Sequence, residues 1–328
     1  MKQSSVLFSV LLLASLSVLF LYGCGTVSSD KSSSVSASKI LYVSDNLSGT
    51  WNIYAMNVDG SRQTLLTLNG SICASIPTPK SCGDPAPSPD GSKLAFNTNK
   101  NTTMEIYVQN FDGSGLIKLT NSPSDERYPS WSPDGVWITF TRDYGGTCRK
   151  ILKARSDGSG SEEALAQTGT YDEKSDWSHD GSTIVFVSDR NSGLGYSELF
   201  TMDTNGSNQH NLFGSLESWS VSYPRWSPDG SKIAFQVDAS FESSSDYNYN
   251  VFVILTSPPY TLTRITTDDS PVDNCQPEWS GDGSEIIFTS DKRHDGVFEI
   301  FSMNADGSNI QNLTSNETVS NLHPAWKI

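Results

Sequence analysis

Short apolar runs and turn sequences alternate along residues 39–328 with a period of about 45 residues. A turn of the Ser-Pro-Asp-Gly type is followed by a β-branched or aromatic run, which predicts a buried strand. An alternating strand then ends in Asp-Gly, where we expect a tight hairpin turn with both central residues at positive φ. A further short strand follows. The predicted buried strands are 94–96, 138–140, 184–186, 233–235 and 286–288. The alternating strands that end in Asp-Gly are 52–60, 105–113 and 299–307.

One anchor position marks each repeat, and it falls six times at spacings of 44 to 53 residues: Pro87, Trp131, Trp177, Trp226, Trp279 and Trp326. The first repeat, beginning at Lys39, has no anchor strand before it, whereas the chain ends with an orphan strand at 323–328. We therefore expect the C-terminal strand to complete the first sheet and close a ring without a free edge. The prediction is an all-β, six-bladed β-propeller with four antiparallel strands per blade.

Two of the repeats, 128–135 and 223–230, carry Trp-Ser-Pro-Asp-Gly in full, and others carry Asp-Gly-Ser. These elements resemble the TolB-type propeller repeat, and the resemblance covers residues 39–328. It implies the propeller fold. TolB has an additional N-terminal α/β domain, and this chain has a serine-rich stretch in its place, so the resemblance is to a TolB-like lipoprotein lacking that domain.

The N-terminal segment has the pattern of an export signal. Residues 1–23 begin with Lys2 and continue as an apolar stretch, and Leu21-Tyr-Gly-Cys24 resembles the lipobox of bacterial lipoproteins. We expect lipidation at Cys24 and a flexible tether over 24–38, with the propeller at 39–328. An uncleaved membrane anchor and an ordinary cleaved signal are the alternatives. The predicted location is the bacterial cell envelope, and Gly25 favours the outer membrane by resemblance to enterobacterial sorting.

The charge balance excludes several classes of partner. The net charge of −15 becomes −16 when the first 23 residues are removed, because they contain only one charged residue, Lys2. Such a surface repels nucleic acid and anionic headgroups. The chain has neither a Gly-x-Ser-x-Gly elbow nor a phosphate-binding loop, and its four histidines are scattered: His179, His210, His294 and His323. We expect no catalysis, metal or other cofactor.

Recurring short polar side chains, five aspartates and one asparagine, follow the second strands of the repeats. Regular recurrence favours loop capping by short side chains over calcium binding, which is the alternative. These residues are Asp45, Asn99, Asp143, Asp189, Asp238 and Asp291.

Loops on the two faces of the predicted disc differ. The Asp-Gly turns are short and uniform, whereas the opposite face, here called the variable face, has loops of varied length and chemistry, which favours recognition there. The residue just before each inner strand should ring the channel mouth, either binding a ligand or only packing the rim. This ring comprises Asp84, Tyr128, Lys174, Tyr223, Gln276 and His323.

The leading hypothesis is a monomeric, lipid-anchored module that binds an envelope protein or peptide through the variable face. A carbohydrate-binding or polysaccharide-processing protein is the alternative, because aromatic rings near that face could stack on sugars. Those rings are Tyr128, Trp219, Tyr223, Tyr247 and Tyr249.

Export makes the remaining cysteines candidates for disulfides. Cys73 and Cys82 share one inter-blade loop, so we expect them to pair. Cys148 and Cys275 are expected in loops of the variable face on opposite sides of the ring, and either a free state or a bridge is open for them.

Overall fold

The computed structural model describes residues 38–45, 51–66, 82–100, 102–146, 148–166, 171–191, 196–212, 220–238, 249–267, 272–292, 296–315 and 318–327. Residues 37–328 form one compact unit. The predicted signal, Cys24 and all of the tether except Ser38 lie outside the described residues, so their roles stay predictions. Among the described residues no helix is long and apolar enough to cross a membrane.

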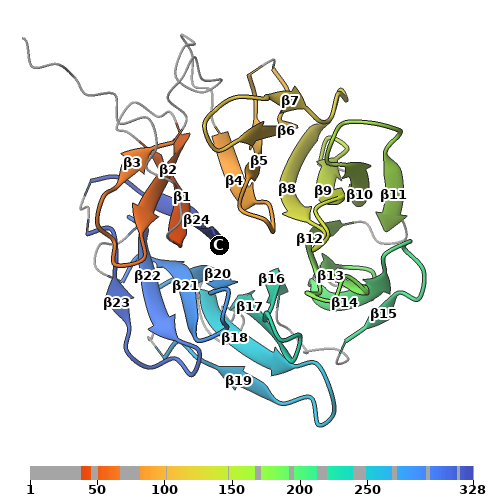
Figure 1. Ribbon diagram of the computed structural model, residues 1–328. Coiled ribbons are helices and arrows are strands. Elements are labelled where there is room, and N and C mark those ends of the chain that lie inside the picture. Colours follow the sequence, from red (N-terminus) through yellow and green to blue (C-terminus); the bar gives the residue numbers. More distant parts are fainter. Residues whose placement is uncertain are drawn as a thin grey trace, which may run out of the picture. The chain divides into compact units, whose positions relative to one another are not determined.

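The described residues form six four-stranded antiparallel sheets arranged around a central axis (Figure 1). The innermost strands are β4 (Cys82–Pro87), β8 (Asp125–Trp131), β12 (Asp172–Trp177), β16 (Ser220–Trp226), β20 (Asn274–Trp279) and β24 (Asn321–Lys327). The second strands are β1 (Lys39–Asp45), β5 (Lys93–Thr98), β9 (Trp137–Asp143), β13 (Thr183–Ser188), β17 (Lys232–Asp238) and β21 (Glu285–Ser290). The third strands are β2 (Trp51–Asn57), β6 (Glu105–Asn110), β10 (Arg149–Arg155), β14 (Glu198–Asp203), β18 (Tyr249–Leu255) and β22 (Glu299–Asn304). The outer strands are β3 (Thr64–Leu65), β7 (Ile117–Lys118), β11 (Glu163–Ala166), β15 (His210–Asn211), β19 (Leu262–Arg264) and β23 (Gln311–Asn312). We call the sheets blades A to F, blade A being β24-β1-β2-β3 and the others following in chain order.

Ring closure is confirmed. Strand β24 pairs antiparallel with β1, and Ile40 lies opposite Trp326 while Val43 lies opposite Leu322. In Figure 1 the dark blue end of the chain lies beside the red-orange first strand. Because the last strand supplies the inner edge of blade A, no blade of the described ring lacks an inner strand.

The second strands carry the core, as their composition predicts. Each of β5, β9, β13, β17 and β21 contributes one phenylalanine that is at most 1% exposed, and burying such a side chain contributes about 1.5–3 kcal/mol. These are Phe96, Phe140, Phe186, Phe235 and Phe288. Side chains alternate between the two faces of each strand, so both faces pack against neighbouring blades.

Positive φ was predicted for both residues of the Asp-Gly turns, which is correct for the glycine and wrong for the aspartate. Gly60 has a φ of +80°, but Asp59 is not left-handed, so only one of the two central residues needs positive φ. The Gly60 amide donates to the carbonyl of Asn57 at 3.0 Å, the pattern of a type I turn followed by a left-handed glycine. The Asp59 carboxylate accepts from the backbone N–H of Ser61 at 2.9 Å and also from its hydroxyl, which explains the Asp-Gly-Ser motif.

Candidate functional site

Each innermost strand contains a bulge at the same place. In β4, for instance, the register against β5 shifts between Gly83 and Ala86. The residue inside every such bulge is left-handed although it is not glycine, which is uncommon for residues with a Cβ. Their φ values are +46° for Asp84, +58° for Tyr128, +53° for Lys174, +51° for Tyr223, +53° for Gln276 and +51° for His323.

These six residues are the ones that the repeat spacing singled out, and we call them the mouth ring. The prediction misplaced them slightly, because they lie within the inner strands and not just before them. A bulge re-aims a side chain that regular pleating would direct into a blade interface. The structure thus brings all six to one end of the channel, where several of them contact one another.

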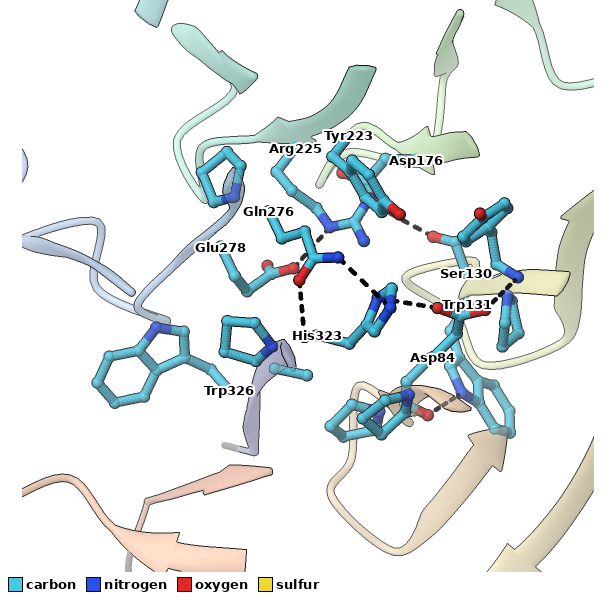
Figure 2. Close-up of a pocket in the computed structure, with 18 of the residues that line it drawn as sticks. Asp84, Ser130, Trp131, Asp176, Tyr223, Arg225, Gln276, Glu278, His323 and Trp326 are labelled. Carbon is cyan, nitrogen blue, oxygen red and sulfur yellow. Dashed lines mark hydrogen bonds and ion pairs between the residues drawn. The ribbon is translucent and has the colours of Figure 1, made fainter. Parts of the chain in front are cut away.

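One half of the mouth ring is joined by hydrogen bonds (Figure 2). His323 Nδ1 lies 2.9 Å from a carboxylate oxygen of Asp84, and the Gln276 and His323 Nε2 atoms are 3.4 Å apart. Burial raises the pKa of the Asp84 carboxyl, but the charge and hydrogen bond of His323 outweigh burial and hold that pKa below its usual value. Asp84 is therefore ionised at neutral pH.

The other half of the mouth ring is aromatic and cationic. The rings of Tyr128 and Tyr223 meet edge to face at 5.8 Å, and Tyr223 lies 5.9 Å from the imidazole of His323. The Lys174 ammonium lies 4.3 Å from the Tyr223 centroid and 5.2 Å from the Tyr128 centroid. Burial lowers the pKa of Lys174 and raises the pKa of both phenols. Tyr128, Tyr223 and Lys174 thus pack against one another within the mouth ring.

Cross-blade hydrogen bonds hold the left-handed backbone in place. The backbone N–H of Tyr128 donates to Asp84 at 3.3 Å, and that of His323 donates to Gln276 at 2.8 Å. In the same way, the backbone N–H of Lys174 donates to the Thr141 hydroxyl at 3.0 Å, and that of Gln276 donates to the side-chain oxygen of Gln236 at 3.1 Å. In all four cases the acceptor is a side chain of the preceding blade, so the bulges also join blades.

A charged layer lies next to the mouth ring along the channel, and sequence reasoning missed it (Figure 2). Arg225 donates to Glu278 at 2.6 Å, while Ser130 donates to Asp176 at 3.0 Å. Burial raises the pKa of Asp176, and it raises the pKa of Glu278 to about 7 despite the Arg225 charge. All four residues occupy the position before an anchor tryptophan, so the middle residue of the Pro-x-Trp pattern was the available signal.

The charged layer lines a channel cavity of about 190 Å³. Five mouth-ring residues, all but Lys174, also line this cavity, together with the anchor indoles of Trp131 and Trp326 and prolines of the inner strands. Further hollows border the mouth ring on the variable face, among them one of about 210 Å³ beside Arg149. The blade A–B hollow, of about 270 Å³, includes Trp51 of blade A, Met104 of blade B and, from the adjoining blade C, Arg127. The blade D–F hollow, of about 520 Å³, includes Ser197, Gln236 and Tyr249.

The recurring acids behave as loop caps where the structure describes their contacts. Asp143 accepts from the Gly146 N–H at 2.7 Å, Asp189 from Tyr171 at 2.9 Å, and Asp291 from Asp273 at 2.8 Å. Among the described residues no group of three or more His, Cys, Asp and Glu side chains could hold a metal ion.

Histidine and cysteine positions were predicted in part. His179 lies in a turn and His210 in β15, as expected, while His294 lies outside the described residues. Cys148 and Cys275 are free thiols, but Cys275 lies in β20 and is 7% exposed, so its expected place in a loop was wrong. Cys73 lies outside the described residues, and its pairing with the buried Cys82 stays a prediction.

The model of the TolB beta propeller domain matches residues 73–222. A "Protein TolB homolog" from Chlorobium chlorochromatii is 32% identical over 148 residues, 44% of this chain and 31% of the relative. An uncharacterized protein from Agrobacterium fabrum is 30% identical over 45% of this chain and 52% of its own length. A "Tol-Pal system protein TolB" from Anaeromyxobacter dehalogenans is 41% identical over 13% of this chain and 10% of its own length. The matches thus span about half or less of each of these relatives.

Solved structures agree on the fold. The crystal structure of TolB from Acinetobacter baumannii has a TM-score of 0.70 at 21% identity, covering 88% of this chain and 66% of that chain. A putative TolB from Agrobacterium tumefaciens has a TM-score of 0.62 at 19% identity, covering 84% and 88%. An oligogalacturonate lyase in complex with manganese, at 13% identity, has a TM-score of 0.52 and covers 84% and 73%. At these identities the likeness concerns the fold alone.

Proposed function

Because the chain carries the TolB-type six-bladed propeller repeat, we propose that it is a binding module of the bacterial envelope that recognises a protein partner through its variable face. The observation that carries this proposal is the mouth ring. Its six left-handed residues contact one another, and four of them donate a backbone hydrogen bond to the preceding blade, which makes the centre of the face rigid before any partner arrives. A preorganised surface loses less conformational entropy on binding.

The two hollows beside the mouth ring support a protein partner. The blade A–B hollow combines apolar groups, Trp51 and Met104, with Arg127, whose side chain is 43% exposed. Aromatic, methionine and arginine side chains are enriched where proteins meet. The acidic surface is compatible with a protein partner and disfavours nucleic acid.

Export, lipidation at Cys24 and a location at the outer membrane belong to the same proposal and rest on the N-terminal sequence. A lipid anchor and a serine-rich tether would hold the propeller near the membrane while leaving its faces accessible. The Tol-Pal description of one relative favours a partner of the same envelope system. The module is proposed to act as a monomer and without catalysis.

The direct experiment is affinity capture from envelope extracts with the tethered propeller as bait. The test variant is Arg127→Glu, which reverses one charge in the blade A–B hollow. The matched control is Arg155→Glu, because Arg155 is 44% exposed and lies at the end of β10 that leads into an Asp-Gly turn. We expect Arg127→Glu to reduce recovery of a specific envelope protein at least tenfold and the control to leave recovery unchanged.

Equal recovery with both variants, or a loss confined to Arg155→Glu, would contradict the proposed face. Circular dichroism and thermal unfolding of each variant establish that a loss of capture does not arise from misfolding. Arg127 contacts Asp125 at 3.3 Å on the surface, and such a pair contributes about 1 kcal/mol or less to stability.

Carbohydrate recognition stays a separate proposal, but the structure changes the set of aromatic residues that support it. Tyr128 and Tyr223 pack against each other and against Lys174, so part of each ring is already covered. Trp219 and Tyr247 lie outside the described residues. Tyr249 lines the blade D–F hollow.

A further inference from the structure

The blade D–F hollow differs chemically from the blade A–B hollow. Its walls carry hydroxyl and carboxamide groups from three blades, together with the aromatic rings of Tyr249 and Phe298. The hydroxyl and carboxamide groups belong to Ser197, Ser220, Ser222, Gln236, Gln276 and Thr289. At about 520 Å³ it is also roomier than the channel cavity. Pockets of this size bind small molecules.

Glu173 and Lys174, two of the three charged side chains in the wall of this hollow, are paired. Glu173 accepts from Arg149 at 2.7 Å and lies 3.3 Å from the Lys174 ammonium. The same ammonium donates to the Ser222 hydroxyl at 2.7 Å. Since the carboxylate and both cations are already paired, this wall does not demand an ion from outside. Asp238, at the edge of the hollow, adds an acceptor for hydroxyl groups.

One donor in the wall of the hollow has no partner among the described residues. Gln236 is 6% exposed, and its side-chain oxygen accepts the backbone N–H of Gln276 at 3.1 Å. This bond fixes the orientation of the carboxamide, so its NH₂ group is left over and donates to no group among the described residues. This NH₂ group is accessible from the hollow, where a ligand can accept its hydrogen bond. The hollow therefore suits a ligand that brings an acceptor to Gln236.

From this arrangement we propose that the blade D–F hollow binds an uncharged, hydroxyl-rich ligand, namely a sugar residue. A sugar offers donors and acceptors to the hydroxyl and carboxamide wall, and its apolar face can pack on Tyr249 and Phe298. The NH₂ of Gln236 donates to a ring or hydroxyl oxygen. This site is separate from the partner surface at the blade A–B hollow and does not depend on the proposed protein binding.

Isothermal titration with neutral saccharides tests the site on the full propeller. The soluble probes are glucose, N-acetylglucosamine and cellobiose, and retention on insoluble peptidoglycan and cellulose tests whether the sugar is recognised within a polymer. We expect saturable binding in at least one arm. Binding of a soluble probe identifies a free sugar, and retention without soluble binding identifies a polymer-borne sugar.

Variants assign the binding to this hollow. Gln236→Glu keeps the acceptor for the Gln276 N–H but removes the NH₂ donor, and it should weaken saccharide binding about tenfold. Tyr249→Ala, at the rim, should weaken it to a similar extent. Gln311→Glu makes the same chemical change on the exposed outer strand β23 and should leave binding unchanged.

Two results would overturn the inference. One is the absence of binding in every arm by wild-type protein whose circular dichroism shows a folded propeller. The other is saccharide binding that survives both Gln236→Glu and Tyr249→Ala. A loss of envelope-protein capture in Arg127→Glu with saccharide binding intact would separate the two surfaces.

Discussion

At the residue scale the mouth ring combines an unusual backbone with a place at the centre of the proposed binding face. Lys174 is typical, because its φ of +53° costs a residue with a Cβ free energy that neighbours must offset. The Thr141 hydroxyl accepts its N–H, and the Tyr128 and Tyr223 rings surround its ammonium. The same backbone that aims the side chain into the channel mouth is thus held by contacts with two other blades.

This backbone predicts an inverted order of stability at position 174. In an ordinary strand alanine is more stabilising than glycine, but a left-handed residue favours glycine. We expect Lys174→Gly to be more stable than Lys174→Ala by about 1 kcal/mol in urea unfolding. At Lys93, the first residue of β5, the same pair of substitutions should show the ordinary order. An ordinary order at both positions would contradict the strained bulge.

The buried charged layer predicts a pH dependence of stability. Burial raises the pKa of Glu278 to about 7, whereas a glutamate in an unfolded chain titrates near ~4.3. Its contribution to stability is therefore fully present below pH ~4.3 and is lost as the pH rises through about 7. Relative to Glu278→Gln, the wild-type free energy of unfolding should fall between pH 4.5 and pH 8, as measured by urea titration. Parallel curves for the two proteins would refute the assignment, and the exposed Glu163→Gln variant is the control.

Sequence reasoning located the mouth ring but not its contacts. A repeat fixes equivalent positions. The spacing of the six anchor positions, Pro87 and five tryptophans, was therefore enough to find all six ring residues. The link between Asp84 and His323 joins residues far apart in the chain, and their meeting depends on ring closure. Asp176, Arg225 and Glu278 were missed because single repeats carry no sign that these unlike side chains face one another.

At the element scale the outer turns dock on neighbouring blades. A Cβ at Gly307 would lie 2.4 Å from the carbonyl oxygen of Ile265, and one at Gly60 would lie 2.3 Å from that of Leu313. These Asp-Gly turns therefore need glycine for two reasons: the positive φ of the residue and the close approach of a neighbouring backbone. The local sequence revealed the turn but gave no sign of this second cause, which involves residues from another blade.

Glycine substitutions separate these two causes. Gly113 has a φ of +82° with open space around it, whereas Gly307 has a φ of +86° and the close carbonyl. We expect Gly113→Ala to cost about 1 kcal/mol and Gly307→Ala at least about 2 kcal/mol more. Thermal and urea unfolding of the two variants measure the difference. Equal losses would show that the inter-blade contact has no energetic weight.

At the scale of the whole molecule, the last strand closes the ring. Deleting residues 323–328 removes most of β24, including Trp326 opposite Ile40, and exposes the edge of β1. We expect a lower unfolding temperature and self-association by size-exclusion chromatography, because an unpaired edge strand can pair with another chain. A deletion of Ile328 alone is the control. Unchanged stability and a monomeric elution would contradict closure by β24.

The fold was predictable because every blade repeats the same strand and turn pattern, whereas function depends on what differs between blades. The hollows of the variable face take side chains from several blades, and repeat spacing says nothing of how these combine. We therefore expect partner contacts to gather on the variable face and to be missing from the face that carries the Asp-Gly turns.

Site-specific photo-crosslinking distinguishes the two faces of the propeller. Tyr144, 44% exposed, follows β9 on the variable face, and Tyr260, 47% exposed, precedes β19 on the opposite face. Each is replaced in turn by a photoreactive phenylalanine and irradiated in intact envelopes, and adducts are identified by mass spectrometry. We expect a specific protein adduct from position 144 and none from position 260. An adduct from position 260 alone would contradict this expectation.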